Sequence, residues 1–261
     1  MTKFILSKWY ADCTSGKGDA MILYSAELNW RGPSIHYCSL LTHRSGSPPH
    51  SRFSLRKQPT PKVQESGIEW KSSAWKAECH WGEPAAGMRE VLFDSPAGSL
   101  EWNCIVPRAS ARWCINGNEM RGWGYVEHLR LSVAPWSLPI HQLRWGRFIN
   151  ATDALVWIDW RGSYNRQVVY YNGVAVSARE IGDRKIVLAD GNVVLSLETE
   201  ATLREGLLGA TALAMLPNLD RLFPARILKV REQKWLSRGV LRQPGRADSA
   251  GMAIHEVVEW P

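Results

Sequence analysis

The sequence of 261 residues has no apolar run long enough to cross a membrane, because no segment approaches the roughly 18 consecutive apolar residues of a spanning helix. Its first residues, 1–9, also lack the apolar core of a secretory signal. We therefore expect a cytoplasmic protein with no integral membrane segment.

Motifs for cofactors and metals are missing as well. The five cysteines are odd in number, and no two have the C-x-x-C spacing of a zinc or redox site. The glycines at 16–18 lack the context of a nucleotide-binding loop, and no G-x-S-x-G motif marks a hydrolase nucleophile. These absences predict free thiols, no metal site and no cofactor.

Basic residues are in excess but are not clustered. The net charge is +7 and the pI is about 9.3. Lysine and arginine are scattered, with no basic run and no recognition-helix or RNP-like motif. We expect no nucleic-acid partner, and no pattern in the sequence indicates an oligomeric state.

Tryptophan is the residue that is present in surplus, with 14 copies. Its ring is a large flat apolar body with one N–H group that needs a partner. A surplus suits ligand cavities, carbohydrate platforms or interface anchors. An apolar small molecule is therefore the partner we expect.

Most of the chain alternates apolar and polar residues with a period of two, which is the pattern of β-strands. Only 203–216 has a helical composition, weakened by two glycines, while 42–64 is rich in Ser, Pro and basic residues and predicts an exposed loop or lid. About a dozen short strands with one short helix near the C-terminus predict an all-β sandwich or barrel. The clearest strand patterns are at 19–30, 34–41, 122–133, 154–160 and 193–200.

One phrase occurs twice in the chain. A basic residue and a tryptophan at 8–9 are followed by Asp-Ala at 19–20 and by Trp-Arg-Gly at 30–32. The same elements recur at 144–145, 153–154 and 160–162. If the repeat is real, it indicates two related β-units. We place the boundary between residues 141 and 142, giving an N-terminal domain of 1–141 and a C-terminal domain of 142–261.

Several segments resemble the lipocalin-like (calycin) superfamily of carotenoid hydratases, tocopherol cyclases and calycin-fold Diels–Alderases. They are K-W-Y-A-D at 8–12, G-W-G-Y-V-E-H-L at 122–129, the tryptophan-containing stretch 135–148, and G-M-A-I-H-E-V-V-E-W at 251–260. The resemblance implies two lipocalin-like antiparallel β-barrels packed side by side. It also implies ligands held in a barrel mouth or between the barrels.

Glu127 is the first candidate catalytic residue. Strand alternation places it on one face with Trp123, Tyr125 and two leucines. Desolvation favours the protonated form of a carboxyl group, and such a group can donate a proton to an alkene or carbonyl. The alternative is a structural brace, in which Glu127 pairs with Arg144 or Arg147.

Asp159 is the second candidate, because it shares a strand face with Leu155 and Trp157. Together Glu127 and Asp159 would make an acid–base pair, although Asp159 is also consistent with a structural aspartate near a turn. Indole faces bind polyenes and stabilise carbocations. The expected substrate-binding set is Trp123, Tyr125, Trp136, Arg144, Trp145, Trp157 and Trp160, with at least three of the tryptophans lining one cavity.

Three hypotheses follow. The first is an enzyme without redox cofactor that cyclises, isomerises or hydrates an isoprenoid or polyketide-like substrate. The second is a non-catalytic carrier or sensor that uses the same cavity. The third is a carbohydrate-binding β-sandwich with exposed tryptophans. Acids inside the cavity favour the enzyme, and a cavity without titratable groups favours the carrier.

Overall fold

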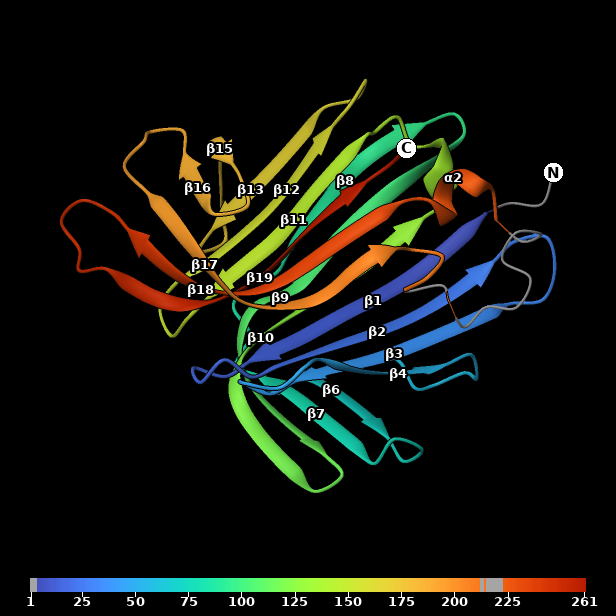
Figure 1. The fold of residues 1–261 in the computed structure, drawn as a ribbon, viewed down its shortest axis with the longest axis horizontal. Helices are drawn as coiled ribbons and strands as arrows, with labels where there is room; N and C mark the ends of the chain where they lie inside the picture. Colours follow the sequence, from blue (N-terminus) through green and yellow to red (C-terminus); the bar gives the residue numbers. More distant parts are fainter. Residues whose placement is uncertain (1–3, 212–213, 215–222) are drawn as a thin grey trace. The chain divides into compact units, whose positions relative to one another are not determined.

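A computed structural model describes residues 4–211, 214 and 223–261. It is 64% strand and 3% helix and contains two antiparallel sheets, one of them nearly closed into a barrel (Figure 1). The chain divides into two compact units, residues 1–137 and 138–261. The predicted all-β class is thereby confirmed. None of the helices in the described ranges has the length and hydropathy needed to cross a bilayer.

Unit 1 is built around a ten-stranded sheet in the order β4-β3-β2-β1-β10-β9-β7-β6-β5, with β8 paired to β9. The first strand therefore lies between the second and the last (Figure 1). The strands are β1 Ile5–Thr14, β2 Ala20–Asn29, β3 Ile35–His43, β4 His50–Ser54, β5 Lys62–Gln64, β6 Gly67–Ser72, β7 Ala77–Gly82, β8 Met88–Ser95, β9 Gly98–Ile115 and β10 Asn118–Leu131. A short 3₁₀ turn, η1 Pro135–Ser137, follows.

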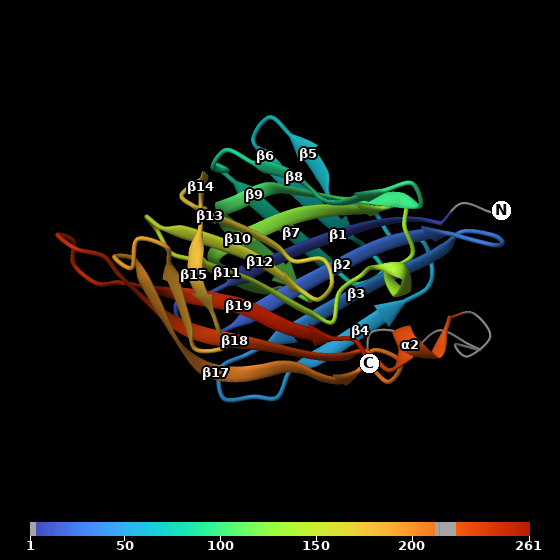
Figure 2. The ribbon, with the colours of Figure 1, turned by 90° about the horizontal axis from the view of Figure 1, so that it is seen from above.

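Unit 2 repeats this topology in a nine-stranded sheet of order β14-β13-β12-β11-β19-β18-β17-β16-β15. Here too the first strand, β11, lies between the second and the last (Figure 2). The elements are β11 Gln142–Ile149, β12 Ala154–Arg161, β13 Arg166–Tyr171, β14 Val174–Val176, β15 Ala178–Ile181, β16 Lys185–Leu188, β17 Val194–Leu207, α2 Ala225–Leu228, β18 Arg231–Arg242 and β19 Ser249–Glu259. The repeated phrase in the sequence thus marks the first hairpin of each sheet.

The two copies of that phrase are out of register by one residue. Trp9 lies five residues before the end of β1 at Thr14, whereas Trp145 lies four residues before the end of β11 at Ile149. A shift of one residue turns a strand side chain to the opposite face. Trp9 accordingly packs against the interior core of unit 1, while Trp145 lies on the face of its sheet opposite the core residue Trp157.

Tryptophan and cysteine fill the interior of unit 1. Four indoles lie in this core together with three thiols and small apolar residues. Burial raises the pKa of Cys38 to about 12, so that thiol stays protonated, and none of the five cysteines forms a disulfide. Much of the tryptophan surplus is therefore core packing. The indoles are Trp70, Trp75, Trp81 and Trp113, and the thiols are Cys13, Cys38 and Cys79.

The predicted helix at 203–216 is wrong for its first part. Residues 203–207 belong to β17, which pairs with β18 as far as Leu207↔Arg231. Pairing with a neighbouring strand overrides the helical propensity of this Leu-rich segment. Residues 212–213 and 215–216 lie outside the described residues, and Ala225–Leu228 forms a short α-helix near the C-terminus.

A glycine of the G-W-G-Y stretch is required by close packing. The Trp81 indole donates a hydrogen bond to the Asp12 backbone oxygen over 2.7 Å. A Cβ on Gly124 would lie 2.5 Å from that oxygen and 2.5 Å from Trp81 Nε1. Only a residue without a side chain lets the indole reach across β10 to β1.

We therefore expect Gly124→Ala to lower the free energy of unfolding by about 1–3 kcal/mol, the usual cost of overpacking a core. Urea unfolding followed by tryptophan fluorescence measures this change. Gly16→Ala is the matched control, because its Cβ meets nothing within 4 Å, and we expect a change below about 1 kcal/mol. Equal effects at both glycines would contradict the packing argument.

Candidate functional site

Glu127 lies on β10 with its side chain on the face of the unit 1 sheet opposite the interior core. It is 6% exposed. The Tyr125 hydroxyl donates to its Oε2 over 2.6 Å, and the Trp102 indole donates to the same oxygen over 2.5 Å. Both donors are buried, so they hold the carboxyl group in one orientation.

The neighbouring strand carries the same tyrosine–acid spacing. On β1, the Tyr10 hydroxyl donates to Asp12 Oδ2 over 2.8 Å. The antiparallel register sets Tyr10 opposite Glu127 and Asp12 opposite Tyr125. Each tyrosine thus faces the acid of the other strand. We call Tyr10, Asp12, Trp102, Tyr125 and Glu127 the tyrosine–carboxylate cluster.

Burial, with the nearby Cys104 and Glu127, raises the pKa of Tyr125 well above its usual value. Tyr125 therefore stays a hydrogen-bond donor at any ordinary pH. Burial likewise raises the pKa of Cys104, so this thiol stays protonated. Sequence reasoning missed Tyr10, Asp12 and Trp102, and the signal that would have found two of them is the Tyr-x-acid spacing on both strands.

Asp159 has a different setting, in unit 2. It is ion-paired with Arg161 over 2.7 Å, and Arg161 also donates to the Ile181 backbone oxygen over 2.7 Å. Arg144 is ion-paired with Asp183. Asp159 and Glu127 belong to different units, and each has partners within its own unit.

The predicted tryptophans of unit 1 lie at opposite ends of β1. Trp123 is on β10 opposite Thr14, the last residue of β1. Trp136 contacts Phe4, with ring centroids 5.6 Å apart, and Trp30, with centroids 5.0 Å apart. Phe4 precedes the first residue of β1, so these two rings do not line one compact cavity.

The predicted tryptophans of unit 2 also separate, because they lie on two faces of one sheet. Trp157 belongs to the interior core, whereas Trp145 and Trp160 lie on the opposite face of β11 and β12. The Lys234 ammonium lies 5.3 Å from the Trp145 ring centroid and is ion-paired with Glu256. Within neither unit are three of the five predicted rings gathered around one cavity.

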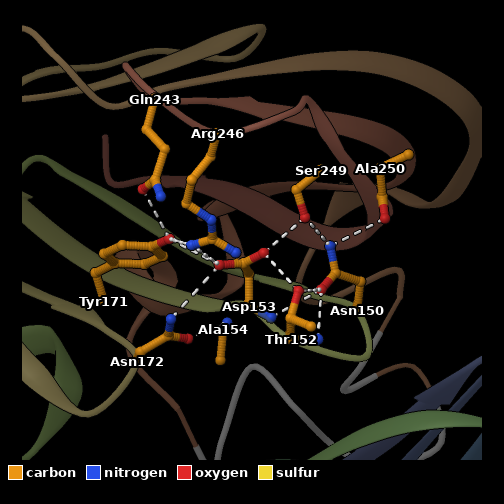
Figure 3. A network of polar contacts seen from close by, with 10 residues as sticks. All are labelled: Asn150, Thr152, Asp153, Ala154, Tyr171, Asn172, Gln243, Arg246, Ser249 and Ala250. Atoms are coloured by element: carbon orange, nitrogen blue, oxygen red, sulfur yellow. Dashed lines mark hydrogen bonds and ion pairs between the residues drawn. The ribbon is translucent and has the colours of Figure 1, made fainter.

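A polar network surrounds Asp153 at the turn between β11 and β12 (Figure 3). Burial alone would raise its pKa, but hydrogen bonds from Ser249 over 2.6 Å, Tyr171 over 2.7 Å and Thr152 over 2.8 Å lower it to about 2. In unit 1, Asp19 accepts from Ser15 over 2.9 Å at the corresponding hairpin. The aspartate of the repeated Asp-Ala pair therefore accepts hydrogen bonds at the first hairpin of both units.

A serine–histidine pair lies inside unit 2. Ser237 Oγ and His255 Nε2 are 2.8 Å apart, and Ser237 is completely buried. The rings of Trp157 and Trp235 lie 6.4 Å and 5.1 Å from the imidazole. Burial lowers the pKa of His255 to about 4. The imidazole is therefore neutral at pH 7 and acts as part of the core.

A cavity in unit 1 has a volume of about 300 Å³. Its apolar wall is formed by Leu40, Trp113, Ile115 and Met120. No aspartate or glutamate lines it. Its polar lining consists of Thr42, His43, Arg44, Ser47, His50, Arg52, Asn116 and Asn118, with Pro48 at the edge. In the described part of the chain, no group of three or more His, Cys, Asp or Glu side chains is placed to hold a metal ion.

Two solved structures share the arrangement of strands. CghA, solved with Sch210972, superposes with a TM-score of 0.59 at 11% identity over 98% of this chain and 88% of that chain. Kievitone hydratase from Nectria haematococca gives 0.57 at 9% identity over 97% and 88%. The fold is lipocalin-like. The resemblance expected from the sequence is thus confirmed for the fold, and no protein family and no curated protein matches the sequence.

The buried His255 predicts a pH dependence for this lipocalin-like protein. Its folded-state pKa of about 4 lies below the value near 6.5 of an unfolded histidine. Its contribution to stability is therefore complete above about pH 6.5 and is lost as the pH falls toward 4. Wild-type protein should lose about 3 kcal/mol of unfolding free energy between pH 6.5 and pH 4 through this histidine. We expect His255→Gln to remove that loss.

Urea unfolding of unit 2 at pH 7, 6, 5 and 4 measures the slope of the unfolding free energy against pH. His141→Gln is the matched control, since His141 is exposed, and it should leave the slope unchanged. A slope that survives in His255→Gln would show that another group titrates.

Proposed function

We propose that the protein is a cofactor-independent enzyme that acts on an apolar, isoprenoid or polyketide-like molecule by cyclisation, isomerisation or hydration. Glu127 is the residue that moves the proton. The observation that carries the proposal is its buried carboxyl group, with Tyr125 and Trp102 converging on one oxygen.

The two donors limit how Glu127 can act. Tyr125 and Trp102 both donate to Oε2 and hold the carboxyl group in one orientation, as general acid–base catalysis requires. A carboxyl group held in this way takes a proton from one atom of the substrate and returns it to another. The cycle then consumes nothing in an isomerisation or cyclisation, and only water in a hydration.

The fold is compatible with such chemistry. One of the two solved structures that share it is, by its name, a hydratase, kievitone hydratase. At 11% and 9% identity, these structural similarities show a shared fold and nothing about activity. The proposal for this chain therefore depends on Glu127 and its donors.

The remaining expectations stay predictions. They are the second acid Asp159, the binding residues Trp123, Trp136, Arg144, Trp145, Trp157 and Trp160, the domain ranges 1–141 and 142–261, and a cytoplasmic location. Of these, Asp159 has a strong structural alternative, because its ion pair with Arg161 explains its burial.

A carrier or sensor of an apolar ligand is the second candidate. The cavity of about 300 Å³ in unit 1 has an apolar wall and no carboxylate in its lining. Such a cavity is large enough for a small ligand and offers no acid for the chemistry proposed above.

We expect Glu127→Gln to abolish turnover while leaving the fold intact. The protein is incubated with an organic-solvent extract of its source cells in D₂O, and products are followed by mass spectrometry. The wild type should convert a compound to an isomer or to a product heavier by one water, with deuterium incorporated. Conversion by Glu127→Gln should be at least about a hundredfold slower, the typical contribution of general acid–base catalysis.

Glu119→Gln on the same strand is the matched control, because Glu119 is exposed and is ion-paired with Arg121. It should convert substrate as the wild type does. Full activity in a folded Glu127→Gln would overturn the proposal. A co-purifying apolar compound that native mass spectrometry finds bound but that is never converted would favour the carrier.

A further inference from the structure

A serine–histidine contact of the same length occurs in both units. Ser237 Oγ and His255 Nε2 are 2.8 Å apart in unit 2, and Ser7 Oγ and His128 Nε2 are 2.8 Å apart in unit 1. Ser237 is completely buried and His255 is 4% exposed, so that pair is closed to a substrate. Ser7 and His128 are only half-buried, and a molecule in solution can reach them.

Strand pairing holds Ser7 and His128 together. β1 and β10 are antiparallel, with Trp9 opposite His128 and Ser7 opposite Arg130. Ser7 and His128 are therefore diagonal neighbours on one face of the sheet, a spacing that an imidazole can bridge. The Trp9 and His128 rings have centroids 4.7 Å apart and are tilted by 40°, so the indole restricts the rotation of the imidazole.

The protonation state of His128 suits a general base. Burial, together with the charge of Arg130, lowers the pKa of His128 below its usual value, and the charge of Glu101 opposes this shift. The imidazole is therefore mostly neutral at pH 7. In the tautomer that carries its hydrogen on Nδ1, Nε2 accepts the proton of the Ser7 hydroxyl. A serine becomes a nucleophile when an adjacent base takes this proton.

Ser7 lies at a small hollow of unit 1 with a volume of about 50 Å³. Trp9 forms part of its wall, and Gln58 and Thr60 contribute polar groups from the segment between β4 and β5. One water molecule occupies about 30 Å³ in the liquid, so the hollow has room for only a few non-hydrogen atoms. An acetyl group is of this size.

The same hollow is lined by a cation. Lys57 contributes to the lining, and a positive charge stabilises the oxyanion that forms when a serine attacks an ester. Glu27 also lines the hollow, where its carboxylate lies 3.9 Å from His36 Nδ1. The hollow thus combines a nucleophile, a base and a positive charge with room for a small acyl group.

We propose that Ser7 and His128 form a catalytic dyad that hydrolyses esters of short-chain carboxylic acids, such as acetate esters. Ser7 Oγ attacks the acyl carbon, and His128 Nε2 takes the hydroxyl proton and passes it to the departing alcohol as the ester C–O bond breaks. Water then attacks the acyl-serine, and its proton returns to Ser7 through His128. The products are one alcohol and one carboxylic acid, and the dyad is regenerated.

This activity is separate from the chemistry proposed for Glu127. Glu127 and His128 are consecutive residues of β10, so their side chains point to opposite faces of the sheet. Ser7 also lies outside any G-x-S-x-G motif, but such dyads are defined by geometry and not by sequence position. A result at Ser7 neither requires nor excludes proton transfer by Glu127.

A fluorophosphonate, which reacts covalently with activated serines, tests the nucleophile directly. We expect the wild type to gain one label on the tryptic peptide of residues 4–8, which contains a single serine. Ser7→Ala should lose this label. His128→Gln should be labelled at least about a hundredfold more slowly, the lower limit for general base catalysis. Folded wild type without a label on residues 4–8 would overturn the proposal.

Ser237→Ala is the matched control, because Ser237 makes the same contact with a histidine but is completely buried. It should be labelled on residues 4–8 as fast as the wild type. A label on residues 235–238, the tryptic peptide that contains Ser237, would contradict the argument from exposure and overturn the proposal.

Hydrolysis of p-nitrophenyl acetate measures turnover. Ser7→Ala should have a kcat/KM at least about a hundredfold below that of the wild type. His141→Gln removes an exposed histidine and should keep the wild-type value, which separates the dyad from hydrolysis by surface imidazoles. The decanoate ester should be hydrolysed with a lower kcat/KM than the acetate ester, because its acyl chain exceeds the hollow.

Circular dichroism establishes that each variant is folded. If His128→Gln does not fold, His128→Phe replaces it, because its ring keeps the packing against Trp9 and lacks the base. Equal hydrolysis by the wild type and a folded Ser7→Ala would overturn the proposal, and so would a preference for the decanoate ester.

Discussion

Pairing of the first strand of each unit with the last strand is the constraint on which both sheets depend. In unit 1, β1 pairs with β10 at every residue from Leu6 to Thr14, and in unit 2 β11 pairs with β19 from Gln142 to Ile149. Because β1 also pairs with β2, its backbone groups are satisfied on both sides. The register of this pairing then decides which side chains meet on each face.

Two kinds of surface result from that register in unit 1. One face forms an interior filled by indoles and thiols, and it leaves a cavity where Trp113, Met120 and the end of β3 meet. The other face carries two tyrosine–acid pairs in opposite directions on adjacent strands. A slip of one residue between β1 and β10 would exchange the faces and destroy both arrangements.

Buried polar groups in this protein fall into two classes. Asp153 and His255 lie among partners that account for their burial. These surroundings lower the pKa of Asp153 to about 2 and the pKa of His255 to about 4. Glu127 is different, because its carboxyl group is oriented by two buried donors on one oxygen. The proposed chemistry depends on this arrangement.

The sequence by itself determined the all-β class, the lipocalin-like resemblance and the repeated hairpin, because period-two alternation and turn residues are local signals. It also singled out Glu127 as a carboxyl in apolar company. Only the tertiary structure decided that 203–207 is a strand, because its partner β18 begins 24 residues further along the chain. The same holds for the faces of Trp9 and Trp145, which depend on where each strand ends. It holds too for the cavity beside Leu40 and Trp113, whose wall comes from strands distant in sequence. Alternation shows that a strand has two faces, but long-range pairing decides what each face meets.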